Sequence, residues 1–528
     1  MSDFPTPGTS AELPAEVDVV VAGSGAAALT GAYTAAKRGL RVLVLEKTDR
    51  LGGTSAYSGA GLWLPGNDVQ RRGGVQDSVE AGLEYLRATV GDRTPADLQQ
   101  AYVRSGPELV AFLERDPAIE FETMPFPDYF EAPGRAKPAG RAICPAPLAG
   151  SELGDRLAQL RPTMNADKFG EQVPRDTLTH GQALIARLLL AIDATGNADI
   201  RTGCPLESLV KVDGRVVGVR AGGREVRARA GVLVAAGGYE CDGDRRQRFH
   251  GLPTGDWTAA YPGSNTGDAL EALEGVGAGV DLLDEAWWCP ATLFPNGRAV
   301  FTLGLTAGIF VGPDGTRFGN ESLPYDRMGH ILLDRIHELG PDVEFWWVFD
   351  SRTETPPGIV SPVPDKEELR AAKLWRTADT VEGLATEIGV PAVALRETVD
   401  RFNGFAASGT DDDFHRGEDD YDRFFAVGDG PNPALVPLDR GPLHAVRIVL
   451  SDLGSKGGAR IGTSGEVLDT DGRPIPGLFA AGNSSASVTG HVYPGPGTPL
   501  GSGMVFAHRA ANAMHAATQQ PVSDAARG

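Results

Sequence analysis

A strand–turn–helix–strand pattern near the start of the chain constrains the fold most strongly. A buried-type run, Val19–Ala22, leads into the sequence GSGAAA, whose glycines are Gly23 and Gly25, and a later apolar run ends at Glu46. This is the order of a Rossmann dinucleotide-binding unit, in which the first glycine allows a tight turn and the second lets the backbone approach a pyrophosphate. The pyrophosphate binds at the helix N-terminus, and an acid about 20 residues further on accepts ribose hydroxyls. An acid at that position argues against a 2′-phosphate, and hence against NADP.

The rest of the chain favours FAD over NAD. The loop that follows Glu46 is rich in glycines and hydroxyl side chains, as in flavoproteins that wrap the pyrophosphate and ribityl chain of FAD. Two later strand-to-glycine segments, residues 232–238 and 478–483, resemble those by which flavoproteins return to the cofactor. No histidine or cysteine lies in residues 52–59, so we predict noncovalent FAD. The predicted cofactor-binding residues are Gly23, Gly25, Ala26, Ala27, Glu46, Lys47, Gly53, Thr54, Ser55, Ser58, Gly59, Ala236, Gly237, Gly238, Gly482, Asn483, Pro499 and Leu500.

The length of 528 residues leaves room for two or three domains. Near Asp284 the sequence changes to aromatics, prolines and broken strands, and flavin-type sequence returns at Ser455. We therefore predict an α/β fold with a discontinuous, Rossmann-like FAD-binding domain and an inserted α+β domain for substrate binding and catalysis. The predicted boundaries are 1–285 and 455–528 for the FAD-binding domain and 286–454 for the insert.

Local signals predict three further elements of the FAD-binding domain. Ser78 is a suitable N-cap for a helix, Pro107 is expected to begin another helix, and Asp213-Gly214 is a favoured two-residue turn of a hairpin. Residues 1–16 and the tail from about residue 519 are expected to be disordered, since they are polar and lack apolar periodicity.

Composition excludes several classes of partner. The net charge of −21 disfavours nucleic acid and anionic membrane surfaces as partners. No stretch approaches the roughly 18 apolar residues of a membrane span. The four cysteines are scattered without a C-x-x-C pair, which favours a reducing compartment and offers neither a zinc site nor a redox dithiol. We therefore predict no metal and no transmembrane segment.

Five motifs together resemble those of the bacterial 3-ketosteroid Δ1-dehydrogenases, which belong to the wider fumarate-reductase-like flavoproteins. Two of them, Gly23–Gly25 and Leu45–Gly59, report only FAD. The other three, Phe126–Tyr129, Asn320–Tyr325 and Tyr493–Gly497, each contain a tyrosine that carries the substrate assignment. The resemblance spans nearly the whole chain.

The resemblance implies FAD-dependent dehydrogenation between carbons 1 and 2 of the A ring of a 3-ketosteroid such as 4-androstenedione, in steroid catabolism. The Tyr493 hydroxyl and the Gly497 N–H would donate hydrogen bonds to the 3-keto oxygen. Tyr325 would take the proton from carbon 2 while a hydride leaves carbon 1 for flavin N5. A tyrosine has an unperturbed pKa of about 10, so Tyr129 would be needed to stabilise the Tyr325 phenolate. The electrons would leave to an external, quinone-like acceptor, in the bacterial cytoplasm, with or without peripheral membrane association.

Two alternatives stay open at this point. The first is another flavin enzyme of the same fold, either a ketosteroid dehydrogenase acting between carbons 4 and 5 or a fumarate-type reductase; the second is a flavin-binding protein without turnover. His415-Arg416 resembles the proton donors of fumarate-reductase-like enzymes, although nothing else in the chain indicates a dicarboxylate clamp. The aromatics of the insert either line a flat steroid cleft or form its core; they are Trp287, Trp288, Phe294, Phe301 and Phe310.

Overall fold

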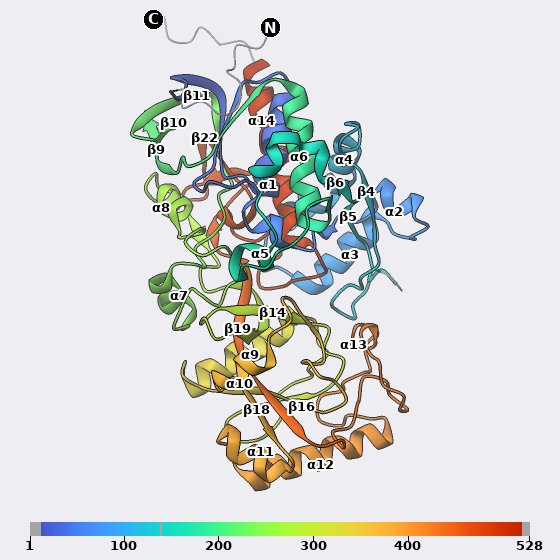
Figure 1. Cartoon of the computed structure of the whole chain (residues 1–528). Coiled ribbons are helices and arrows are strands. Elements are labelled where there is room, and N and C mark those ends of the chain that lie inside the picture. The colour runs from blue at the N-terminus through green and yellow to red at the C-terminus, as the bar shows by residue number, and fades with distance from the viewer. Residues whose placement is uncertain (1–11, 138–139, 520–528) are drawn as a thin grey trace, which may run out of the picture. The chain divides into compact units, whose positions relative to one another are not determined.

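The computed structural model describes residues 12–137 and 140–519, which belong to two compact units (Figure 1). Both units are discontinuous in sequence. The first consists of Met1–Tyr239, Gly263–Glu285 and Ser455–Gly528, and the second of Glu240–Pro262 and Ala286–Gly454.

The second unit contains all of the predicted insert, 286–454, and differs from it by the addition of Glu240–Pro262. Long-range contacts explain the addition. Arg246 forms a buried ion pair with Asp452 at 2.8 Å, and the Thr258 hydroxyl donates a hydrogen bond to the same carboxylate at 2.8 Å. The assignment of the two units to cofactor and substrate binding stays a prediction.

An eight-stranded sheet with a parallel centre forms the framework of the first unit. β1 pairs with β2 and β11, and β11 pairs with β22 from the far end of the chain. Val19, Val20 and Val21 are completely buried, as expected of a parallel strand covered on both faces. In spatial order the strands are β21 (Glu466–Leu468), β22 (Pro474–Ala480), β11 (Arg224–Val234), β1 (Glu16–Ala22), β2 (Val42–Leu45) and β8 (Ala198–Arg201), with β10 (Arg215–Ala221) on β11 and β9 (Leu206–Val212) on β10.

Helices from both ends of the sequence cover this sheet. α1 packs against α14 and α6, and the three helices lie together in Figure 1. The predicted α/β architecture is confirmed. The helices of this unit are α1 (Ala26–Lys37), α2 (Asp68–Arg72), α3 (Val79–Val90), α4 (Ala96–Leu113), α5 (Met164–Phe169), α6 (His180–Thr195), α8 (Asp268–Glu274) and α14 (Thr498–Gln519). Its short strands are β3 (Leu62–Trp63), β4 (Phe121–Met124), β5 (Ala142–Pro145), β6 (Leu148–Ala149), β7 (Thr177–Leu178), β12 (Val280–Asp281) and β20 (Gly458–Ala459).

Two of the three local predictions are confirmed. The Ser78 hydroxyl caps α3 by accepting the N–H of Ala81, and Asp213 and Gly214 both have positive φ, as the hairpin turn between β9 and β10 requires. The prediction for Pro107 is wrong, because this proline lies inside α4, which begins at Ala96. The apolar face of α4 is buried before Pro107 as well as after it. Tertiary packing therefore keeps the residues before the proline helical, although proline disfavours a position inside a helix.

At the chain ends, residues 1–11 and 520–528 of the predicted disordered segments lie outside the described residues. The prediction of disorder is wrong for Glu16, which opens β1, and Gln519 is the last residue of α14. Within residues 12–137 and 140–519, no helix combines the length and the apolar character needed to cross a membrane. The structure describes all four cysteines, and none of them forms a disulfide bond.

The second unit is built on a largely antiparallel sheet. β19 is its longest strand and pairs with both β16 and β18, while α11 and α12 pack against each other and form part of a separate apolar core. The strands are β13 (Ala286–Leu293), β14 (Ala299–Leu303), β15 (Ile309–Val311), β16 (Phe345–Asp350), β17 (Ile359–Val360), β18 (Trp375–Ala378) and β19 (Leu443–Ser455). The helices are α7 (Gly243–His250), α9 (Tyr325–Leu339), α10 (Lys366–Ala371), α11 (Val381–Ile388), α12 (Ala392–Ser408) and α13 (Asp420–Phe424).

The aromatic residues of the insert serve mainly as core. Trp288 is fully buried, with its ring edge-on to His250. Phe310 is fully buried against Trp347. Phe294 and Phe301 are only half-buried, and the Phe301 ring meets a predicted catalytic side chain described below.

His508 gives the first unit a predicted pH dependence. Its buried ring hydrogen-bonds to Thr34 at 3.0 Å and to Asn512 at 3.0 Å, and burial, aided by Arg38 and Arg509, lowers its pKa to about 4. An unfolded histidine has a pKa near 6.5, so between about pH 6.5 and 4 the unfolded state binds a proton that the folded state excludes. We expect the melting temperature to fall as the pH is lowered from about 6.5 to about 4, and to fall less in His508→Gln.

Thermal unfolding at pH 6.5, 5.5 and 4.5 measures this effect. His415→Asn removes an exposed histidine and serves as the matched control, with a pH profile like that of the unsubstituted protein. Parallel profiles for His508→Gln and the unsubstituted protein would show that His508 does not set the acid sensitivity.

Candidate active site

The glycine turn at the end of β1 has the geometry of a phosphate site. Gly23 has φ +104°, and a Cβ there would lie 2.3 Å from the carbonyl oxygen of Ala235, just after β11. Only glycine fits at this position. Gly25 caps α1 in an extended conformation, and the N–H of Ala26 donates to the Ser55 hydroxyl at 3.1 Å. The start of α1 therefore offers backbone amides and the positive end of the helix dipole, which favour an anion.

Glu46 joins the end of β2 to the loop that follows it. One carboxylate oxygen accepts the Ser24 hydroxyl at 2.5 Å, and the other accepts the N–H and the hydroxyl of Thr48, both at 2.8 Å. Ser24 in turn accepts the N–H of Gly52 at 3.0 Å. The acid predicted for the ribose thus also fixes the glycine-rich loop beside the start of α1, and Ser24 is a supporting residue that sequence reasoning missed.

Lys47 is held by α8. Its ammonium donates to Thr266 at 2.7 Å and forms an ion pair with Asp268 at 2.8 Å. The Lys47 ammonium lowers the pKa of the Asp268 carboxyl, although burial opposes that shift. The structure therefore gives Lys47 a tertiary role, and its contact with the cofactor stays a prediction.

Small residues from distant parts of the sequence meet beside the start of α1. A Cβ on Gly503 would lie 3.0 Å from the Cα of Gly482 and 3.2 Å from the Cβ of Ala27. The Ser484 hydroxyl accepts the N–H of Ala236 and donates to the carbonyl of Gly237, both at 2.9 Å. At these positions the segments meet through backbone and small side chains, as the close approach of a long dinucleotide requires, so the residues fit FAD.

The remaining predicted cofactor residues lie on the same segments. Thr54 accepts a hydrogen bond from Asn265 at 3.3 Å, and Gly53 lies beside Gly25, since a Cβ on Gly53 would be 3.9 Å from the Gly25 Cα. Asn265 and Ser484 are further residues that sequence reasoning missed; only Ser484, two positions after Gly482, lay near a recognised motif. The others are Ser58 and Gly59 in the loop after β2, Gly238 after β11, Asn483 after β22, and Pro499 and Leu500 in the first turn of α14.

The two predicted carbonyl-binding groups lie side by side in the turn before α14. The N–H of Gly497 donates to the Tyr493 hydroxyl at 3.3 Å, and the Tyr493 side chain is buried. Gly497 has φ +88°, and a Cβ there would lie 2.0 Å from the carbonyl group of Gly61. Only glycine fits where this turn passes Gly61, and the turn places the Gly497 N–H beside the Tyr493 hydroxyl.

Tyr129 is part of the same arrangement. Its ring meets that of Tyr493 edge-on, with centroids 5.1 Å apart, and its N–H donates to the carbonyl of Pro494 at 2.9 Å. The Tyr85 hydroxyl donates to the same carbonyl at 2.7 Å, while Asp128 is buried against Arg141 at 3.0 Å. Sequence reasoning missed Tyr85 and Arg141 because both lie far from this turn in the sequence. Only the fold brings Tyr85 to the Pro494 carbonyl and Arg141 to Asp128.

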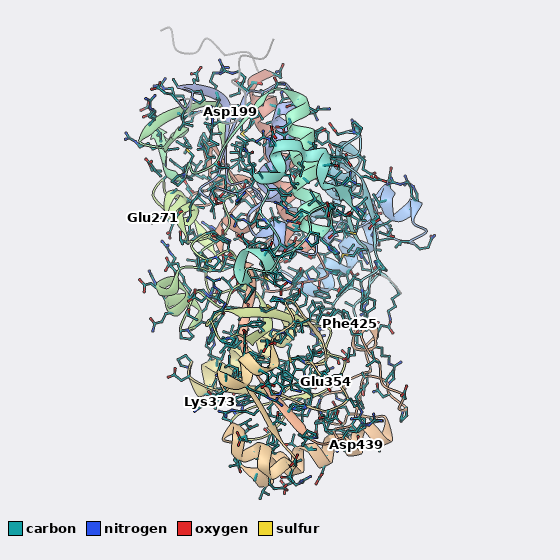
Figure 2. The ribbon with its side chains drawn as sticks, viewed as in Figure 1. Asp199, Glu271, Glu354, Lys373, Phe425 and Asp439 are labelled. Carbon is teal, nitrogen blue, oxygen red and sulfur yellow. The ribbon has the colours of Figure 1, made fainter. Side chains whose placement is uncertain are left out.

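Tyr325 lies in the second unit, where it is the first residue of α9. Its ring packs edge-on against Phe301, with centroids 4.8 Å apart, and it lines a cavity together with Met328 and Phe425, the last of which is labelled in Figure 2. The cavity beside this buried tyrosine has room for about one water molecule. The predicted hydrogen bond from Tyr129 to Tyr325 stays a prediction.

The segment before Tyr325 is fixed by buried charge. Glu321 is bound by Arg317 at 2.9 and 2.8 Å and by Arg416 at 3.0 Å. The Arg416 guanidinium also donates to Ser322 and to a backbone carbonyl, and it is completely buried. His415 is exposed beside Glu418. Arg416 therefore makes mainly structural contacts, and the fumarate-type alternative, which would use it as a proton donor, is the less supported one.

Comparisons with known proteins agree with this geometry. Residues 18–500 match the FAD binding domain family. The chain is 39% identical to a 3-oxosteroid 1-dehydrogenase of Rhodococcus opacus, over 94% of this chain and 98% of the relative. It is 35% identical to a 4-oxocyclohexanecarboxylate 2-dehydrogenase of Sinomonas cyclohexanicum, over 93% and 92%.

Among solved structures, a 3-ketosteroid delta1-dehydrogenase from Sterolibacterium denitrificans, in complex with 1,4-androstadiene-3,17-dione, superimposes with a TM-score of 0.88. It is 32% identical to this chain, and the match covers 96% of this chain and all of that one. One family assignment is supported by the tyrosine motifs, by the FAD-binding cradle and by the full-length similarity. The chain belongs to the FAD-binding flavoprotein family and, within it, to the 3-oxosteroid 1-dehydrogenases.

Proposed function

We propose that this protein is an FAD-dependent 3-oxosteroid 1-dehydrogenase that introduces a double bond between carbons 1 and 2 of a 3-ketosteroid such as 4-androstenedione. The observation that carries the proposal is the partly buried pair formed by the Tyr493 hydroxyl and the Gly497 N–H, 3.3 Å apart. A bound ketone would take the place of the Tyr493 oxygen as acceptor for the Gly497 N–H, and the Tyr493 hydroxyl would donate to the same carbonyl oxygen. The full-length similarity to enzymes of this name supports the choice of substrate.

The pair at the start of α14 would activate the substrate. A proton beside a ketone becomes acidic when its carbonyl is polarised, because the charge left behind spreads onto the oxygen. Tyr493 and Gly497 would stabilise that charge through two hydrogen bonds in a buried site, where such bonds are strongest. The first turn of α14 follows directly, so its free amides add positive potential to the same region.

Tyr325 would take the proton from carbon 2. Its place in the first turn of α9 puts it at the positive end of that helix dipole, which favours negative charge. Tyr129 would donate a hydrogen bond to the phenolate. When bound, FAD supplies the acceptor for the hydride that leaves carbon 1.

The proposal also covers an external, quinone-like electron acceptor and a location in the bacterial cytoplasm, with or without peripheral contact with the membrane. A single dinucleotide fingerprint in the chain supports an acceptor other than NAD. Four dispersed cysteines that form no disulfide bond support a reducing compartment.

The test is anaerobic bleaching of the flavin by 5α-androstane-3,17-dione, with the product identified by mass and NMR. This substrate can lose hydrogen from carbons 1 and 2 or from carbons 4 and 5, so the product reports the regiochemistry. We expect bleaching and a 1-ene product, and a 1,4-diene from androst-4-ene-3,17-dione. A 4-ene product would assign the alternative regiochemistry and overturn the proposal.

4-Oxocyclohexanecarboxylate is the control substrate, since it carries a ring ketone without the steroid skeleton. Bleaching by this compound alone would overturn the steroid assignment while keeping the chemistry. A flavin that neither ketone bleaches would indicate a protein without this activity.

A further inference from the structure

The proposed reaction leaves a proton on Tyr325 at every turnover, and that proton must depart before the next cycle. Tyr325 is 8% exposed, so direct exchange with solvent is restricted. A second group that can accept the proton is therefore needed close to Tyr325. The cavity that Tyr325 lines also contains two acids, Glu321 and Asp422, in its wall.

Glu321 is unsuited to accept a proton. Its carboxylate is bound by two arginines, Arg317 and Arg416, and by the N–H of Phe310 at 3.1 Å. Burial would raise the pKa of this carboxyl, but the arginines outweigh burial and hold the pKa below its usual value. Glu321 therefore stays ionised and serves as a structural anion.

Asp422 is placed differently. It is 4% exposed, and its Oδ2 accepts the Asn320 side-chain amide at 2.9 Å and the N–H of Gly417 at 2.8 Å. Its Oδ1 accepts no hydrogen bond from any residue that the structure describes. A buried polar atom without a protein partner is usually hydrogen-bonded to ordered water, and the cavity that Asp422 shares with Tyr325 is the space for it.

The surroundings of Asp422 allow it to change its protonation state. Burial raises the pKa of its carboxyl, and the negative charge of Asp419 adds to this shift. The Asn320 amide, the Gly417 N–H and the Arg416 guanidinium act in the opposite direction. The result is a carboxyl that is easier to protonate than Glu321, in the wall of the same cavity.

We infer that Asp422 is the first stage of a proton relay from Tyr325. The inference rests on the proposed function, in which Tyr325 is the base. The O–H bond of Tyr325 breaks, a new O–H bond forms on Oδ1 of Asp422 through water in the cavity, and the phenolate is restored. Asp422 is itself buried, so the proton then passes to solvent as the cavity exchanges its water, and no electrons move.

Asp422→Asn separates this role from a structural one. The carbonyl oxygen of the new amide can accept the same two N–H groups from Asn320 and Gly417, but the side chain cannot take up a proton. Asp420→Asn, at a neighbouring exposed acid of α13, is the matched control. Both variants are used as holoenzymes.

The experiment follows deuterium loss from carbon 2. The flavin is first reduced with dithionite so that no hydride can leave, and androst-4-ene-3,17-dione deuterated at carbon 2 is added in ordinary water. Mass spectrometry then measures the washout. We expect the unsubstituted protein and Asp420→Asn to exchange at similar rates, and Asp422→Asn to exchange at least about tenfold more slowly, because the deuteron returns to the substrate.

A second measurement distinguishes relay from damage. Single-turnover bleaching of oxidised Asp422→Asn should stay within about threefold of the unsubstituted rate, since the first proton needs only Tyr325. Equal washout in Asp422→Asn and the unsubstituted protein, or equal loss of bleaching and washout in the variant, overturns the relay. Failure of the unsubstituted protein both to bleach and to exchange overturns the proposed function itself.

Discussion

Tyr325→Phe is expected to slow flavin bleaching by androst-4-ene-3,17-dione by about 10²–10⁴-fold, the range for loss of a general base. The variant keeps the ring that packs on Phe301, so folding and flavin content should not change. Only the phenolic oxygen is lost, and with it the group that takes the proton from carbon 2. Anaerobic stopped-flow bleaching gives the rate, and a steroid titration gives the affinity, which should change little.

Tyr33→Phe is the matched control for this experiment. It also removes a buried tyrosine hydroxyl, which donates to Asp116 at 3.0 Å, but it does so in α1, at a position outside the predicted site. We expect a small loss of stability and a normal bleaching rate from this control. A Tyr325→Phe variant that bleaches within about tenfold of the unsubstituted rate would exclude Tyr325 as the base.

Of the substitutions proposed for this protein, Gly497→Ala should lower the free energy of unfolding the most. A left-handed conformation for a residue other than glycine costs about 1–3 kcal/mol. The new Cβ would also lie 2.0 Å from backbone atoms of Gly61, which cannot move aside as a flexible side chain could. We expect a loss of about 3 kcal/mol or more in the free energy of unfolding, together with a collapse of the bleaching rate, because the turn that pairs this N–H with Tyr493 must shift.

Gly404→Ala provides the comparison for that substitution. Gly404 lies inside α12, and a Cβ there would meet no other atom within 4 Å. Alanine is a better helix former than glycine, so this variant should be more stable by about 0.5–1 kcal/mol. Thermal unfolding measures both variants, and a Gly497→Ala protein with unchanged melting and bleaching would contradict the proposed role of this turn.

Elements dictated by neighbouring residues could be predicted from the sequence. The start of the FAD-binding fold was accessible because strand, turn and helix signals follow one another between Val19 and Glu46. The hairpin at Asp213 was accessible for the same reason. The pairing of Tyr493 with Gly497 also lies within reach of local reasoning, since the two residues are four positions apart in a turn.

Features that depend on distant partners could not be predicted in the same way. The burial of Arg416 against Glu321 has no local signal, because Glu321 lies almost a hundred positions earlier in the chain. The grouping of residues 240–262 with the second unit depends on the ion pair between Arg246 and Asp452. Pro107 misled the prediction because tertiary packing of α4 overrides the preference of proline for a helix start.

The parallel pairing of β1 with β11, and of β11 with β22, has a consequence for biosynthesis. A ribosome releases β1 hundreds of residues before β22 and α14, so the nucleotide cradle stays open at one side until these two elements have emerged. Such non-local pairing folds slowly and leaves unpaired strand edges exposed in the meantime. Nascent chains of this protein should therefore acquire FAD only after α14 has emerged from the ribosome, and the need for chaperones should be greatest between the release of β1 and the release of α14.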